Sequence, residues 1–223
     1  MVARRAPDGT TTLPVLRAEG ALAVRRTGPG AVHLVGTAAG PLGGDEVEVV
    51  LRVEAGARLL VRQVAASLVL PGHREVASQA HVVAEVAAGG LLDLAWEPAI
   101  VTALARHATR TSVVLDGDAA VRLLEQVQLG RWGEAEGHWQ GRIDVERDGR
   151  AVLRHALALG PGSPAWDALD SPRALLSLLD VPGAGGAAGT NGGAVRMPLA
   201  AGGTLVSATG PDLSAARRDA RAA

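Results

Sequence analysis

Four short turns, each placed between two apolar segments, recur along the middle of the 223-residue chain. Their glycines are Gly56, Gly89, Gly117 and Gly149, which are separated by 33, 28 and 32 residues. Around these turns apolar residues alternate with polar ones, which is typical of β-strands with one buried face. A repeat of this length is typical of stacked supersecondary units. The spacing predicts a mainly β fold, a solenoid-like stack of β-hairpin layers with one or two short helices, and it leaves an ordinary β-sandwich meander open.

The clearest of these units is the stretch from Gly40 to Arg62. Residues 46–53 and 57–62 alternate in hydrophobicity on either side of the turn at Ala55-Gly56, so we predict a β-hairpin. Three glycines, Gly40, Gly43 and Gly44, come just before the first strand and give the backbone unusual freedom in φ. The carboxylate of the next residue, Asp45, is therefore expected at the mouth of that strand.

The rest of the chain divides into a tail, one domain and a C-terminal segment. Residues 1–12 are predicted to be a flexible tail, residues 13–210 a single β domain, and residues 211–223 a helix capped by Asp212 or a tail. Near the end of the domain, Ser171-Pro172 is a helix-start signal, but the apolar run that follows also suits a buried strand.

Two further elements are predicted before the C-terminal segment. The Gly- and Ala-rich residues 182–193 are expected to form a flexible loop. Residues 195–199 and 204–208 then form a last hairpin candidate across Gly202-Gly203.

Composition excludes several classes of function. All 22 basic residues are arginines, so neither a P-loop lysine nor a Schiff-base lysine is present. The net charge of −1 without a basic stripe argues against nucleic-acid binding. The chain has no cysteine, which fits a cytoplasmic protein, and it has neither a signal-peptide pattern nor an apolar run long enough to cross a membrane.

No arrangement of polar residues along the chain indicates catalysis. The six histidines are scattered without the spacing of a metal site, and no Gly-x-Ser-x-Gly motif occurs. We therefore expect no enzyme activity and no stably bound cofactor or metal. Carboxylates within apolar stretches, such as Asp45, Glu97 and Glu125, need a partner or water, because an unpaired buried charge is costly. An ion pair or a backbone cap would satisfy each of them.

Five short motifs, taken together, resemble the UreD family of urease accessory proteins, also called UreH. They are Gly40-Pro-Leu-Gly-Gly-Asp45, Gly56-Ala-Arg-Leu-Leu60, Leu92-Asp-Leu-Ala-Trp-Glu-Pro-Ala-Ile100, Leu129-Gly-Arg131 with Gly133-Glu134, and Asp148-Gly149. Their order and spacing agree with the family over residues 17–210. The chain departs from the family pattern at residues 63–71 and 99–104.

The resemblance implies a protein that is not an enzyme but a scaffold for urease maturation. Such a protein binds apo-urease and UreF, which brings the GTPase UreG, and nickel passes through its interior without being held. The resemblance places three residues on the nickel path, namely Asp45, Glu125 and His155. It also implies motif or partner-contact roles for Gly40, Gly43, Gly44, Glu97, Arg131 and Glu134. A stand-alone β-rich ligand-binding module is the alternative.

Overall fold

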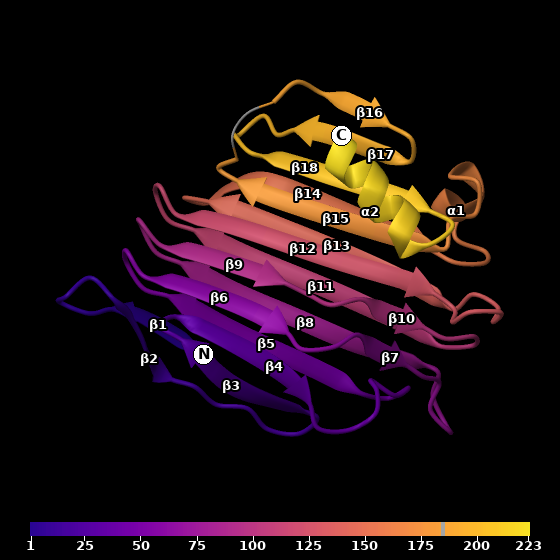
Figure 1. Ribbon diagram of the computed structural model, residues 1–223, viewed down its shortest axis with the longest axis horizontal. Coiled ribbons are helices and arrows are strands. Elements are labelled where there is room, and N and C mark those ends of the chain that lie inside the picture. Colours follow the sequence, from indigo (N-terminus) through magenta and orange to yellow (C-terminus); the bar gives the residue numbers. More distant parts are fainter. Residues whose placement is uncertain (184–185) are drawn as a thin grey trace.

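The computed structural model describes residues 1–183 and 186–223, which form two β-sheets stacked face to face (Figure 1). Sheet A has the strand order β14 (Arg150–Leu159), β13 (His138–Arg147), β11 (Arg106–Leu115), β8 (Ala77–Val86), β5 (Glu46–Val53), β1 (Val2–Arg5) and β2 (Thr11–Val15). Sheet B has the order β16 (Gly189–Asn191), β17 (Ala194–Pro198), β18 (Thr204–Gly210), β15 (Ala174–Val181), β12 (Ala120–Leu129), β9 (Leu91–Ala95), β6 (Arg58–Gln63), β4 (Ala31–Gly36) and β3 (Leu22–Gly28). Two short strands, β7 (Ser67–Val69) and β10 (Ala99–Val101), continue sheet B beside β12.

The strands stack as a solenoid, as the spacing of the turns predicts. In sheet A, β5, β8, β11 and β13 are parallel neighbours, and in sheet B, β6, β9 and β12 are parallel neighbours. The chain alternates between the sheets, passing from β5 to β6, then from β8 to β9 and from β11 to β12. Each of these passages adds one rung to the stack (Figure 1).

The prediction of hairpins at the turns is wrong for three of the four. The turns at Gly56, Gly89 and Gly117 join strands of opposite sheets, and only Gly149 joins two paired antiparallel strands, β13 and β14. All four glycines have positive φ, between 55° and 74°. A period-2 pattern shows which face of a strand is buried, but it does not distinguish a neighbour in the same sheet from one in the sheet opposite. The inner faces of the two sheets bury one another here.

The core between the sheets is aliphatic. Leu51, Leu59, Leu92, Leu115 and Leu123 are at most 1% exposed and belong to one cluster that both sheets share. A second cluster, at the end of the strands near β10, surrounds Trp139, which is 1% exposed. Because Phe and Tyr are absent, leucine, valine and alanine fill most of the space.

The prediction for the N-terminal residues is also wrong. Residues 1–12 are not a tail, since β1 pairs in parallel with β5 and β2 pairs with β1. Ala3 on β1 is completely buried. Because most residues of this segment are polar, its sequence gives little sign of a strand, yet its backbone extends the edge of sheet A.

Two helices complete the described residues, α1 (Pro164–Ala168) and α2 (Leu213–Ala222). The Asp212 side chain caps α2 by accepting a hydrogen bond from the amide of Ala215 at 2.8 Å, as the sequence predicts. The apolar run after Ser171 is strand β15, so of the two open interpretations the buried strand is correct. The last hairpin is confirmed as β17 and β18. The prediction of a flexible loop over residues 182–193 is wrong at residues 189–191, which form strand β16 paired with β17, and residues 184–185 lie outside the described residues.

Candidate binding cavity

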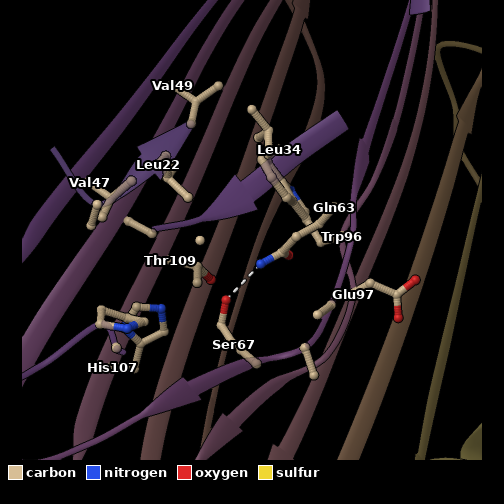
Figure 2. Close-up of a pocket in the computed structure, with 18 of the residues that line it drawn as sticks. Leu22, Leu34, Val47, Val49, Gln63, Ser67, Trp96, Glu97, His107 and Thr109 are labelled. Carbon is tan, nitrogen blue, oxygen red and sulfur yellow. Dashed lines mark hydrogen bonds between the residues drawn. The ribbon is translucent and has the colours of Figure 1, made fainter. Parts of the chain in front are cut away.

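A cavity of about 340 Å³ lies between the two sheets. Its walls come from β4, β5, β6, β8, β11 and β12, and the exposed loop residues 38–39 and 64–66 lie at its mouth. Figure 2 shows its lining, in which aliphatic side chains such as Leu34, Val47 and Val49 surround a few polar groups. The residues with a polar side chain that contribute to its wall are Asp45, Gln63, Ser67, His81, Trp96, Glu97, His107, Thr109, Thr111, Glu125 and Gln126, although the side chain of His81 occupies an outward position of β8 and that of Gln126 binds Arg217 on α2.

Glu125 is the buried carboxylate of this cavity. It follows Val121 and Leu123 on the inward face of β12, so the alternation of the strand turns its side chain to the interior. Glu125 is 8% exposed, and its Oε1 accepts a hydrogen bond from the Thr109 hydroxyl at 2.7 Å. Burial raises the pKa of Glu125 to about 7, because the ionised form loses its hydration. Near neutral pH this group exchanges a proton readily.

His107 lies on the opposite sheet, two residues before Thr109 on β11. It is 5% exposed, and its Nδ1 is 2.9 Å from the hydroxyl oxygen of Ser78 on the neighbouring strand β8. Burial lowers the pKa of His107 to about 4, so the imidazole is neutral at pH 7. The cavity therefore holds a neutral nitrogen donor, hydroxyl oxygens and one carboxyl of variable charge.

The predicted residue Asp45 also lines the cavity, just before the first residue of β5. Its Oδ2 accepts a hydrogen bond from the amide of Leu42 at 2.8 Å, which closes the turn of the glycine-rich motif. Gly40 lines the cavity beside it, and Gly43 packs directly on the backbone of residues 72–75. Asp45 thus fixes the loop with one oxygen and is part of the cavity wall.

Glu97 lines the cavity as well, but at its outer part. Its side chain is exposed, and Figure 2 shows its carboxylate pointing away from His107 and Thr109. This orientation suits a contact with solvent or with a partner better than a contact with a ligand deep in the cavity.

His155 does not join the other predicted path residues. It lies on β14, two strands beyond β11 in sheet A, and is not part of the cavity wall. Its register partner is Ile143, a core residue, so the imidazole faces the interior. Burial lowers the pKa of His155, and its Nε2 is buried without a hydrogen-bond partner among the described residues.

Arg131 and Glu134 bind one another in the loop between β12 and β13. The guanidinium contacts the carboxylate at 2.9 Å, and the amide of Arg131 donates to the same carboxylate at 2.9 Å. These hydrogen bonds lower the pKa of Glu134 to about 2. The pair therefore fixes the loop, which leaves its neighbour Trp132 fully exposed.

The polar groups that β8 and β11 contribute to the interior were not predicted from the sequence. Ser78, His107, Thr109 and Thr111 face the interior because they occupy inward positions of their strands. The alternation of His107, Thr109 and Thr111 along one strand is a signal that could have been used, since it places three polar residues on one buried face.

The donors are spread along the cavity and do not converge. Within residues 1–183 and 186–223, no group of three or more His, Asp or Glu side chains could hold a metal ion together. Nor does any helix among these residues have the length and apolar character needed to cross a membrane.

A β-solenoid with a mostly apolar cavity between its two sheets, lined also by a few polar groups, is the class of protein that these observations define. The model of the UreD urease accessory protein family matches residues 1–223, so the chain belongs to this family. It is 41% identical to the urease accessory protein UreD of Streptomyces coelicolor, over 98% of this chain and 91% of the relative. It is 37% identical to that of Frankia alni, over 96% and 87% of the two chains, respectively.

Proposed function

We propose that this protein is a urease maturation factor of the cytoplasm, which holds apo-urease and UreF together and conducts nickel through its interior. UreG would join the assembly through UreF. Membership of the UreD urease accessory family supports the maturation role. The passage of nickel is supported by the cavity, and by Glu125 above all.

The proposed nickel path rests mainly on the position of Glu125 in the cavity and on its raised pKa. A mobile Ni²⁺ ion needs nitrogen and oxygen donors, and it must leave each position as readily as it enters. Glu125, Thr109 and the neutral imidazole of His107 offer such donors in the cavity without forming a closed cage. Because the pKa of Glu125 is about 7, a cation that approaches can displace its proton at little cost.

The position of Asp45 suggests where the ion enters. Asp45 and Gly40 line the cavity near the exposed loop residues 38–39, whereas Glu125 is almost completely buried. The proposed path therefore leads from Asp45 at the mouth to Glu125 inside. His155 would serve a later part of the path, beyond the cavity.

A stand-alone ligand-binding module remains the second candidate because of the size of the cavity. Its volume of about 340 Å³ is sufficient for a small organic molecule, and most of its lining is apolar. Such a module would not require urease or UreF for its action.

Co-purification distinguishes the scaffold for urease maturation from the stand-alone binding module. The tagged chain is expressed with the urease subunits and UreF of its host, and bound proteins are identified after affinity purification. We expect apo-urease and UreF to accompany the wild-type chain, and the Glu125→Gln variant to retain both, since residue 125 is buried. Recovery of the chain alone, without either partner, would contradict the scaffold role and favour the binding module.

A further inference from the structure

The two sheets differ in what covers their outer faces. On sheet B, α2 packs over β15 and β18 through a small apolar cluster that includes Leu176, Ala208 and Ala216 (Figure 1). On sheet A, nearly all outward side chains of β5, β8, β11 and β13 are at least partly exposed. Three of them are valines, Val50, Val83 and Val114, with 52%, 41% and 43% of their surface exposed. Apolar side chains at the centre of a broad flat face favour an interface.

The charges on this face are divided between its two halves. On β5 and β8, three outward carboxylates (Glu46, Glu48 and Glu85) accompany one guanidinium (Arg52), which gives a net charge of −2. On β11, β13 and β14, four outward guanidiniums accompany two carboxylates, which gives a net charge of +2. These six residues are Arg106, Arg110, Arg142, Arg154, Asp144 and Glu146. A face with one negative and one positive half is complementary to itself.

We propose that the outer face of sheet A binds a second copy of this chain. A two-fold axis parallel to the strands, between β8 and β11, would place β5 of one copy over β13 of the other. Glu48, His81, Arg110 and Arg142 stand in one row of the sheet. The axis therefore brings Glu48 opposite Arg142 of the second copy, twice in the dimer, because a two-fold interface repeats each contact.

The same axis matches a second pair of charges. Arg52, Glu85, Val114 and Glu146 form another row, so Arg52 meets Glu146 of the second copy. Beside the axis, Val83 meets Ser112 of the second copy and Val114 meets Glu85, so the middle of the interface is of mixed character. The two pairs of opposite charges, each repeated by the axis, therefore favour this orientation of the copies.

The area of the face is sufficient for a specific dimer. The five strands from β5 to β14 are 8 to 10 residues long. At about 4.8 Å between strands and 3.3 Å per residue, they cover roughly 700 Å². Standard protein interfaces bury about 800 Å² on each partner.

A charge exchange tests this dimer. We expect the wild-type chain to sediment as a dimer at micromolar concentration, and to dissociate more readily as salt screens the charges. Glu48→Arg and Arg142→Glu should each weaken the dimer about tenfold or more, because each places like charges together twice. An equimolar mixture of the two variants should form a heterodimer, in which both contacts regain opposite charges.

Glu19→Arg is the matched control, since Glu19 is exposed outside the strands of sheet A, and it should sediment as the wild type does. A wild-type chain that stays monomeric up to about 100 μM, a concentration at which micromolar association would be nearly complete, would overturn the proposal and leave the face to a different protein. Dimers of unchanged strength in both single variants would also overturn it. The proposal does not depend on the nickel path, so these results leave the proposed function untouched.

Discussion

Replacing Gly43 by alanine should destabilise the chain far more than the same change at the adjacent Gly44. A Cβ atom at Gly43 would lie 1.9 Å from the carbonyl oxygen of Glu75 and 2.5 Å from the amide nitrogen of Gly72. Both are backbone atoms, and Gly72 and Glu75 are joined by a hydrogen bond of 2.7 Å, so neither can move aside alone. We expect a loss of about 3 kcal/mol or more in the free energy of unfolding.

Gly44 provides the matched comparison. Its φ is 94°, but a Cβ atom there would have no neighbour within 4 Å, so alanine would suffer backbone strain alone. That strain costs about 1–2 kcal/mol. Urea denaturation of both variants measures the difference, and equal midpoints would show that the loop before β5 does not pack on residues 72–75 as described.

The Glu125→Gln variant should be more stable than the wild type at alkaline pH. In the unfolded chain this carboxyl loses its proton near its usual pKa of 4.5, whereas in the folded chain it keeps the proton to about 7. Between these values the folded state binds more protons, so stability falls as the pH rises. At 1.36 kcal/mol per pH unit, the wild type loses about 3 kcal/mol that the glutamine variant keeps.

Comparing the pH dependence of stability in the wild type and the Glu125→Gln variant distinguishes the contribution of Glu125 from that of the other titratable residues. Asp45, His81, Glu97 and His107 also line the cavity. The pKa of His107 is lowered to about 4 from the usual 6.5, so this group makes stability rise with pH in that window, in both proteins. The difference between wild type and variant therefore reports Glu125. It should be small at pH 4 and largest above pH 7, and a constant difference would show that residue 125 is not buried as a carboxyl.

The sequence predicted the fold better than it predicted the connections. The alternation in residues 46–53 and the spacing of the turn glycines identified strands and stacking. They could not show that the turn at Gly56 leads to the opposite sheet, because a strand presents the same buried face in either case. The N-terminal strand β1 escaped notice, since it has only four residues, of which Ala3 alone is completely buried, and it joins β5 through its backbone.

The candidate site was predicted through its carboxylates alone. Asp45 and Glu125 are 80 residues apart in the chain but line one cavity, and their place on a nickel path stays a prediction. His107 and Thr109 become visible only when β11 is placed opposite β12, because their chemistry depends on what the other sheet presents. The proposed step from the cavity to His155 requires a path past β13.

The most direct test of nickel conduction is the metal content of urease matured by an altered chain. Urease is purified from cells that carry the Asp45→Asn Glu125→Gln double variant, the wild type, or Glu19→Gln as the exposed control, and nickel is determined by mass spectrometry. We predict several-fold less nickel with the double variant, while apo-urease and UreF still co-purify with it. Nickel content equal to the wild type in that variant would contradict a path through this cavity.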